Sequence, residues 1–140
     1  MAKVTIIGAG IVGLAIAREL SLNGIKDLLI IEKESEIASH QSSRNSGVMH
    51  AGLYYKPNSL KAKLSREGIN LMKNFCNKNK IEWRECGKVV VATEDNEIER
   101  LDNLFLRGLK NNLRGISKLN KNQIQKYDPH VVAKKGILVP

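Results

Sequence analysis

Residues 4–32 read VTIIGAGIVGLAIARELSLNGIKDLLIIE, and this stretch decides the fold of the chain. An apolar run at 4–7 leads into a cluster of glycines, and an amphipathic segment follows. Asn23-Gly24 forms a turn signal, and a second apolar run at 28–31 ends on an acid, Glu32. The pattern predicts a strand over residues 3–8, a helix over 11–23 and a strand over 28–32, the order of a βαβ unit.

The glycines of this stretch have the spacing G-x-G-x-x-G at Gly8, Gly10 and Gly13, which is typical of a dinucleotide site. Gly8 lets the chain turn sharply, Gly10 lets the backbone approach a pyrophosphate, and Gly13 lets the helix lie close to the strand. The free N–H groups of the helix start, which include those of Ile11 and Val12, would face the phosphates. A glycine-rich turn in an ordinary α/β protein is the alternative, but it would not require the strand–helix–strand context or the terminal acid.

The acid at the end of the second strand indicates which nucleotide binds. Glu32 lies about twenty residues after the motif, where a carboxylate can accept both ribose hydroxyls. An acid at this place favours a free 2′-hydroxyl, and therefore FAD or NAD over NADP. We include the neighbouring Lys33 in the predicted cofactor site.

Residues 38–55, ASHQSSRNSGVMHAGLYY, form a segment with little periodicity and many short hydrogen-bonding side chains. Because it follows the ribose-binding acid, this loop can run back across a bound cofactor. The loop residues predicted to contact the cofactor can donate hydrogen bonds or allow close approach to a flat ring: Ser42, Ser43, Arg44, Asn45, Ser46 and Gly47. An ordinary polar surface loop is the alternative reading of the same composition.

The remaining sequence predicts further helices and strands. A helix is expected over 57–80, with a core-facing stripe of Leu60, Leu64, Leu71, Met72 and Phe75. Extended structure is expected over 81–93, a helix from an N-cap at Thr93 to about residue 112, and short strands at 116–119 and 136–139. Asn120 and Gln123 look like a capping pair for a short helix.

The composition of the chain limits which partners are expected and whether a membrane span is expected. The net charge of +9 invites a nucleic-acid reading, but the lysines are scattered and aromatic residues make up only 4% of the chain. Lysine side chains on the solvent-exposed faces of the predicted helices explain this positive charge better, so no nucleic-acid partner is expected. No apolar run approaches the roughly 18–20 residues of a membrane span.

The first strand is predicted to begin at about residue 3, so no signal peptide is expected. Cys76 and Cys86 have neither a C-x-x-C nor a metal-ligand spacing, so reduced thiols and no metal site are expected. The expected location is the cytoplasm, with peripheral attachment to the inner membrane as an alternative.

Three segments resemble a known family. SSRNSGVMHAGLYYKPNSLKAKLSREG at 42–68, RECGKVVVATEDNEIERLDNLFLRG at 84–108 and YDPHVVAKKGILVP at 127–140 are similar to FAD-dependent L-2-hydroxyglutarate dehydrogenases and oxidases. These enzymes belong to the D-amino-acid-oxidase-like superfamily. The glycine motif and Glu32 are common to many flavoenzymes, whereas the three segments carry the more specific resemblance.

The resemblance implies an α/β fold in which residues 1–80 belong to a Rossmann-like FAD-binding domain and residues 81–140 begin an α+β substrate-binding domain. Such enzymes are longer than this chain. The chain is therefore expected to be the N-terminal part of the family's fold: a fragment, a truncated reading frame, or one piece of a split protein whose partner chain supplies the rest.

The resemblance also implies a reaction. The full enzyme would oxidise the C2 hydroxyl of L-2-hydroxyglutarate to 2-oxoglutarate by hydride transfer to flavin N5, and pass the electrons to oxygen or a quinone. His50, the only histidine of the NSGVMHAGLYY core, is the candidate catalytic residue, with a purely structural role as the alternative. An amine or amino-acid oxidase of the same superfamily, and a non-catalytic fragment, stay open as other functions.

Overall fold

The computed structural model describes residues 3–140 and contains two compact units, residues 1–48 and 49–140. The predicted boundary after residue 80 concerns the domains of the complete enzyme, and it stays a prediction. Each unit has its own local structure, and each is described by itself below.

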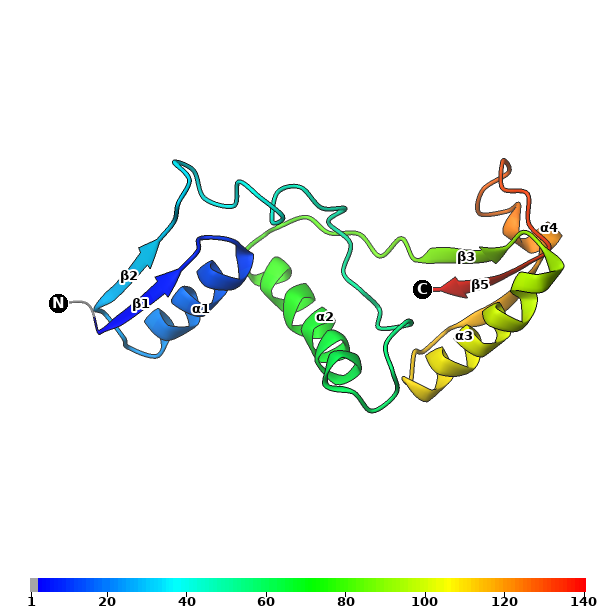
Figure 1. Cartoon of the computed structure of the whole chain (residues 1–140), viewed down its shortest axis with the longest axis horizontal. Helices are drawn as coiled ribbons and strands as arrows, with labels where there is room; N and C mark the ends of the chain where they lie inside the picture. The colour runs from blue at the N-terminus through cyan, green and yellow to red at the C-terminus, as the bar shows by residue number, and fades with distance from the viewer. Residues whose placement is uncertain (1–2) are drawn as a thin grey trace. The chain divides into compact units, whose positions relative to one another are not determined.

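The first unit is a βαβ unit. β1 (Val4–Ile7), α1 (Ile11–Leu22) and β2 (Leu28–Ile31) follow in order. The two strands are parallel, with Val4 opposite Leu28 and Ile7 opposite Ile31. Figure 1 shows β1 and β2 side by side with α1 along them. The small side chain of Ala17 is buried in α1, as close packing of a helix on a sheet requires. The predicted strand–helix–strand order is confirmed.

The second unit opens with a loop and a long helix, α2 (Leu60–Lys78). Ser59 caps this helix by accepting a hydrogen bond from the Ala62 N–H at 3.2 Å. The helix starts later than predicted because Asn58 has a left-handed φ of +65°, outside the helical region. The expectation of a core-facing stripe is wrong for Leu60, Leu64 and Leu71, whose side chains are 73%, 60% and 61% exposed in the described chain.

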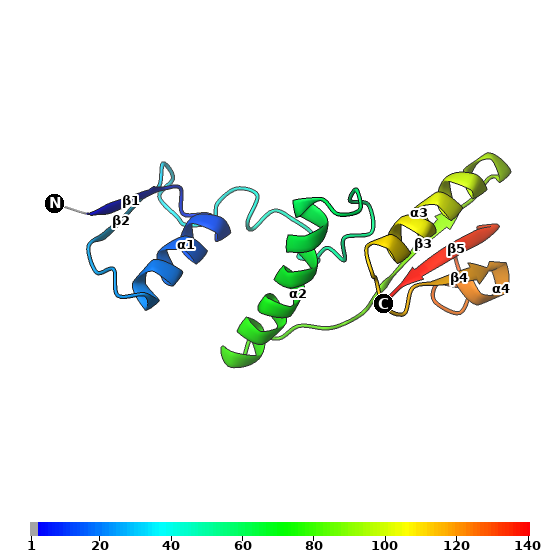
Figure 2. The same cartoon turned by 90° about the horizontal axis from the view of Figure 1, so that it is seen from below.

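An antiparallel sheet with two helices completes the second unit. The sheet has the order β3-β5-β4, formed by Lys88–Ala92, Lys135–Val139 and Ser117–Asn120. A 3-10 turn, η1 (Asp95–Glu97), leads into α3 (Ile98–Lys110), and α4 (Lys121–Ile124) follows β4. Figure 2 shows α3 along the sheet and α4 beside β4.

Alternation along β5 divides the core of this unit into two clusters. Ile137 and Val139 pack with Leu101 of α3. The loop before α2 contributes Leu53, which is 1% exposed. Leu138, with the opposite orientation, packs with the cluster that contains Ile124 of α4. Successive side chains of a strand point to opposite faces, so the sheet lies between α3 and α4.

The two predicted caps of this unit have different outcomes. Asn120 and Gln123 form the expected capping box, with bonds of 3.0 and 2.9 Å. Thr93 is not the N-cap. Glu94 is the N-cap of η1 and Glu97 that of α3, and the Thr93 N–H and hydroxyl both donate to the Glu97 carboxylate, at 2.7 and 3.0 Å.

Candidate functional site

The glycine-rich turn between β1 and α1 has the geometry that its spacing predicts. Gly8 has φ of +99°, a conformation that side-chain-bearing residues rarely adopt, and its N–H donates to the Ile31 carbonyl of β2 at 2.7 Å. A Cβ on Gly13 would lie 2.0 Å from the Gly8 carbonyl oxygen and 3.4 Å from the Ile6 side chain. The first turn of α1 therefore lies directly on the end of β1.

The start of α1 presents unpaired N–H groups. Gly10 is the N-cap and has no side chain to cap the helix. The Ser42 hydroxyl accepts the Ile11 N–H at 2.9 Å, and its own proton can be donated to a phosphate oxygen. Within residues 3–140, the N–H groups of Val12 and Gly13 have no hydrogen-bond partner. This donor set, with the helix dipole, is suited to an anionic phosphate.

Glu32 closes the other side of the turn. Its Oε2 atom accepts the Ala9 N–H at 2.7 Å, and its Oε1 atom accepts the N–H groups of Lys33 and Glu34 at 2.9 and 3.1 Å. These bonds, that from Ala9 first, lower the pKa of the carboxyl group below its usual value of 4.5. A carboxylate has about four acceptor positions, so one direction at Oε2 stays open for a ribose hydroxyl.

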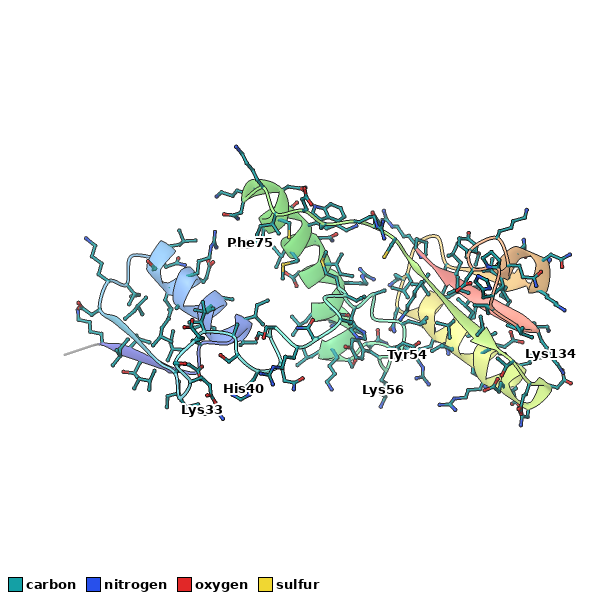
Figure 3. All side chains as sticks on the ribbon, turned by 90° about the horizontal axis from the view of Figure 1, so that it is seen from above. Lys33, His40, Tyr54, Lys56, Phe75 and Lys134 are labelled. Carbon is teal, nitrogen blue, oxygen red and sulfur yellow. The ribbon has the colours of Figure 1, made fainter. Side chains whose placement is uncertain are left out.

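The side chain of Lys33 points to a different partner. Its ammonium lies 3.5 Å from the Glu34 carboxylate, which also contacts His40 Nε2 at 2.8 Å. Figure 3 shows Lys33 and His40 close together on the segment that follows β2. Lys33 thus contributes its backbone N–H to the Glu32 site, while its side chain is exposed and can reach a ligand only by leaving this pair.

The loop after His40 is closed by one asparagine. The Asn45 side-chain amide donates to the carbonyl oxygens of residues 41 and 42 at 2.7 and 2.9 Å, and its Oδ1 accepts the Gly47 N–H at 2.6 Å. These bonds shape the loop that carries Ser42 to the start of α1. Asn45 therefore helps to hold Ser42 in place, and its own polar atoms are used within the loop.

The other predicted loop contacts lie on the surface of this unit. The Ser43 hydroxyl donates to the His40 carbonyl at 3.4 Å. The side chains of Arg44 and Ser46 are exposed, and within residues 3–140 they have no hydrogen-bond or ionic partner. Of the loop residues, the structure brings Ser42 to the glycine motif and leaves Arg44 and Ser46 free for a ligand.

His50 belongs to the second unit and lies just before a tight turn. Its ring is exposed and stacks on Tyr55, with ring centroids 6.3 Å apart and planes inclined by 28°. The neighbouring Tyr54 ring lies under the Lys88 ammonium at 4.5 Å. An exposed imidazole can exchange protons with a bound substrate.

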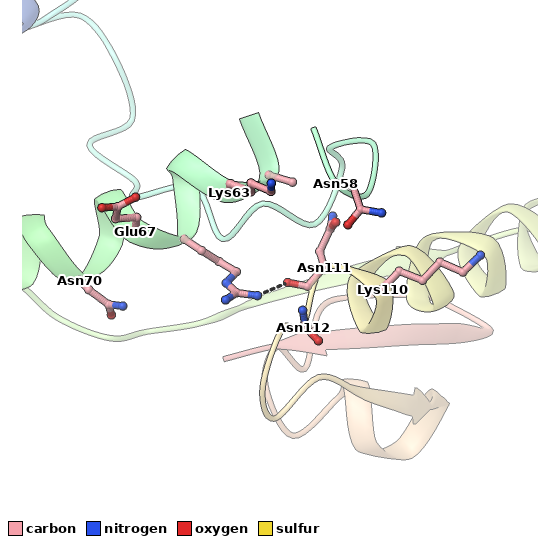
Figure 4. A pocket seen from close by; sticks show the side chains of 9 residues that line it. Asn58, Lys63, Glu67, Asn70, Lys110, Asn111 and Asn112 are labelled. Atoms are coloured by element: carbon pink, nitrogen blue, oxygen red, sulfur yellow. Dashed lines mark hydrogen bonds between the residues drawn. The ribbon is translucent and has the colours of Figure 1, made fainter. Parts of the chain in front are cut away.

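A separate cavity lies between α2 and the end of α3. It has a volume of about 470 Å³ and a polar lining that includes Asn58, Lys63, Arg66, Glu67, Lys110 and Asn111 (Figure 4). None of the residues predicted to bind a cofactor or to act in catalysis lines it. The cavity is therefore not the predicted site.

Comparison with known proteins decides the family. The sequence model described as "FAD dependent oxidoreductase" matches residues 3–140. The chain belongs to this family. The α/β fold class and the FAD cofactor predicted from the sequence are confirmed. Within the family, the glycine turn, the free N–H groups of α1 and Glu32 are the residues whose geometry fits the pyrophosphate and ribose of FAD.

Curated relatives of this FAD-dependent oxidoreductase are close in sequence. The chain is 46% identical over 138 residues to "L-2-hydroxyglutarate dehydrogenase, mitochondrial" of Nematostella vectensis, covering 98% of this chain and 30% of that protein. It is 48% identical over 130 residues to the protein of the same name from Dictyostelium discoideum, covering 91% and 29%. The chain thus spans about 30% of the length of these relatives.

A solved structure has the same fold. The L-α-glycerophosphate oxidase of Mycoplasma pneumoniae, solved reduced with dithionite and with FAD bound, superposes with a TM-score of 0.83 at 32% identity. The superposition covers 96% of this chain and 36% of that one.

Among the described residues of this chain, no helix combines the length and the apolar character needed to cross a membrane.

Two features of the site escaped sequence reasoning. The Ala9 N–H is a donor to Glu32, and only its place inside the glycine motif could have suggested this. Asn111 holds the turn after His50 from 56 and 59 residues away, and nothing in its sequence neighbourhood indicates such a contact. The individual cofactor and catalytic assignments stay predictions.

Proposed function

We propose that this chain is part of an FAD-dependent dehydrogenase that oxidises the C2 hydroxyl of L-2-hydroxyglutarate to the keto group of 2-oxoglutarate. The observation that carries the proposal is the identity of 46% across 98% of the chain to a protein with that activity in its name. Because the chain spans about 30% of that relative, the activity is proposed for the full-length protein.

The proposed cofactor contacts lie in the first unit. The turn at Gly8, Gly10 and Gly13 and the N–H groups of Ile11 and Val12 would hold the pyrophosphate. Glu32 would accept a ribose hydroxyl, and the Ser42 hydroxyl would donate to a phosphate while it accepts the Ile11 N–H. Further proposed contacts on the flanking loop are Lys33, Ser43, Arg44, Asn45, Ser46 and Gly47. When bound, FAD supplies the acceptor for two electrons.

His50 is the proposed base of the reaction. Its imidazole would take the proton of the C2 hydroxyl, and stacking on Tyr55 would limit the orientations of its ring. A positioned base of this kind contributes about 10²–10⁴-fold to the rate. The guanidinium of Arg44, exposed and without a partner within residues 3–140, is proposed to bind a carboxylate of the substrate or a phosphate.

The remaining assignments follow from the family. We propose that residues 1–80 belong to the FAD-binding domain and 81–140 to the start of the substrate-binding domain, which further sequence or a partner chain completes. The substrate is a small dicarboxylate, oxygen or a quinone accepts the electrons, and nucleic acid is not a partner. The proposed location is the cytoplasm, with peripheral attachment to the inner membrane as an alternative.

Anaerobic reduction of the purified full-length protein tests the activity. We expect L-2-hydroxyglutarate to bleach the flavin absorbance and D-2-hydroxyglutarate to leave it unchanged. Equal bleaching by glycine or sarcosine would contradict the proposal and assign the protein to the amine oxidases. Re-oxidation of the reduced protein by oxygen or by a soluble quinone then identifies the electron acceptor.

A further inference from the structure

The turn that follows His50 is held by a side chain far away in the sequence. Asn111, the C-cap residue of α3, is 5% exposed. Its amide nitrogen donates to the carbonyl oxygens of Gly52 and Tyr55, both at 2.9 Å. The Tyr55 N–H also donates to the Gly52 carbonyl at 3.3 Å, which closes residues 52–55 into a tight turn. Asn111 therefore bonds both ends of this turn.

The orientation of the Asn111 amide follows from these bonds. Exchanging its nitrogen and oxygen would set Oδ1 against two carbonyl oxygens, so only the present orientation gives attraction. In this orientation Oδ1 is buried and has no partner within residues 3–140. A buried acceptor without a partner costs free energy, and the side chain keeps this arrangement because both donors of its amide are used on the turn.

Further contacts from α3 fix the same turn. Arg107 donates to the Tyr54 carbonyl at 3.2 Å, one turn of helix before Asn111. The side chain of Leu53 is buried against Gly108, where an added Cβ would lie 2.9 Å from Leu53 Cδ1. Side chains at the end of α3 thus bond the carbonyls of residues 52, 54 and 55. The backbone of α3 at Gly108 packs on the side chain of Leu53.

The contacts of Asn111 and Arg107 with residues 52–55, called the clamp below, are also connected to α2. Arg66 donates to the backbone carbonyl of Asn111 at 3.1 Å, and the dashed line at Asn111 in Figure 4 marks this bond. A Cβ on Gly52 would lie 2.8 Å from the Ser65 hydroxyl of α2, and Gly52 has φ of +85°. The turn is therefore packed between two helices, and its backbone has little freedom to move.

We propose that Asn111, assisted by Arg107, is a positioning residue that fixes the His50–Tyr55 ring pair for proton transfer. The inference rests on the proposed role of His50. Tyr55 belongs to the clamped turn and carries the ring against which His50 stacks, so loosening the turn displaces the surface that orients the imidazole. A displacement of about 1 Å at a reacting group can lower a rate by about 10²-fold.

The test compares Asn111→Ala and Arg107→Ala with Lys110→Ala in the full-length protein. Lys110 is exposed at the same helix end and has no hydrogen-bond or ionic partner in the described part of the chain, so it controls for loss of a side chain and a charge there. Single-turnover flavin reduction gives the rate constant and the apparent substrate affinity. Hydrogen exchange of the amides at 50–56 gives a readout that needs no turnover.

We expect Asn111→Ala to lower the reduction rate about 10-fold to 100-fold, and Arg107→Ala to lower it less, with the apparent substrate affinity changed less than about twofold. Exchange at 50–56 should become faster in both variants and stay unchanged in Lys110→Ala. In a His50→Ala background, the same substitutions should change the remaining rate by less than about twofold, because the group that they position is absent.

Losses of equal size with and without His50 would overturn the inference, since they would show a general structural effect. Unchanged rates in both variants would also overturn it. Arg107 is exposed, so Arg107→Ala decides the question if Asn111→Ala does not fold. If another substrate reduces the flavin, the proposed function is wrong, and the same comparison made with that substrate still tests the clamp.

Discussion

The backbone N–H of Ala9 donates to Oε2 of Glu32 at 2.7 Å, and this bond joins the glycine turn to the end of β2 across 23 residues. Two more N–H groups hold Oε1, so the carboxylate has a fixed orientation in the free protein. A ligand group that is already oriented loses little conformational freedom on binding. Glu32, the acid predicted to bind the ribose, thus also connects the glycine turn after β1 to the end of β2.

Glu32→Gln should weaken FAD binding about 10-fold or more. The amide keeps one acceptor oxygen in place of two, so its nitrogen must face backbone N–H donors, either that of Ala9 or those of Lys33 and Glu34. The charge-assisted bond to a ribose hydroxyl is lost as well, and bonds to charged groups are the stronger class. Titration of the flavin-free protein with FAD, followed by flavin fluorescence, measures the change in Kd.

Glu34→Gln is the matched control for this substitution. Glu34 carries the same side chain two residues away, and it pairs with Lys33 and His40 on the surface. Because exposed ion pairs contribute little, its replacement should leave the FAD affinity within about twofold. Equal losses for the two variants would mean that general charge near the loop, and not the Glu32 carboxylate, determines affinity.

Gly13→Ala should abolish FAD binding and destabilise the first unit. The new Cβ would lie 2.0 Å from the Gly8 carbonyl oxygen, a backbone atom that cannot rotate away, so α1 must move off β1. Overpacking of this kind costs about 1–3 kcal/mol or more. Thermal unfolding and flavin content report the two effects.

Gly68→Ala is the control for Gly13→Ala, because it makes the same chemical change where no loss of stability is expected. Gly68 lies inside α2, and nothing is within 4 Å of its added Cβ. Alanine in a helix interior is favoured over glycine by up to about 1 kcal/mol, so this variant should be as stable as the parent or more stable. Destabilisation by both variants would show that the space around Gly13 is not the cause.

Sequence pattern predicted the first unit well because its signals are local. Gly8 is fixed by its conformation and Gly13 by close contact within a few residues, and Glu32 follows from the end of a short strand. The capping box at Asn120 and Gln123 is likewise a contact across three residues. Such features depend on backbone geometry that neighbouring residues determine.

Long-range packing is where the sequence was insufficient. Helical spacing predicted a core stripe in α2, yet Leu60, Leu64 and Leu71 are exposed, because periodicity shows which side of a helix is apolar and not what lies against it. Asn111 resembles any polar helix end in the sequence. Its bonds to Gly52 and Tyr55 exist only because α3 folds back onto the loop.

Acid should weaken the second unit through two carboxylates. Bonds from the Thr93 and Glu94 N–H groups lower the pKa of Glu97, and the Lys118 ammonium, 2.7 Å from Asp102, lowers that of Asp102. Their usual values are 4.5 and 3.8. A lowered folded-state pKa gives stability that is present above the usual value and is lost as the pH falls through the folded value.

Glu97→Gln and Asp102→Asn test this dependence. Each variant should be less stable than the parent near pH 7, and the difference should shrink as the pH falls below about 4. Urea unfolding followed by Trp83 fluorescence across that range measures it. A difference that stays constant with pH would mean that the amide disturbs packing and that the charge of the carboxylate contributes nothing.

His50→Gln should lower flavin reduction by about 10²–10⁴-fold while FAD content is preserved, because the proposed cofactor contacts lie between Gly8 and Gly47 and leave His50 out. Anaerobic stopped-flow reduction with L-2-hydroxyglutarate gives the rate, and the visible spectrum gives the flavin content. His130→Gln is the control, since within the described residues His130 contributes only its backbone N–H to a bond, with Asp128 at 2.9 Å. A full rate in His50→Gln would contradict the role of base, and loss of flavin from this variant alone would make His50 a cofactor-binding residue instead.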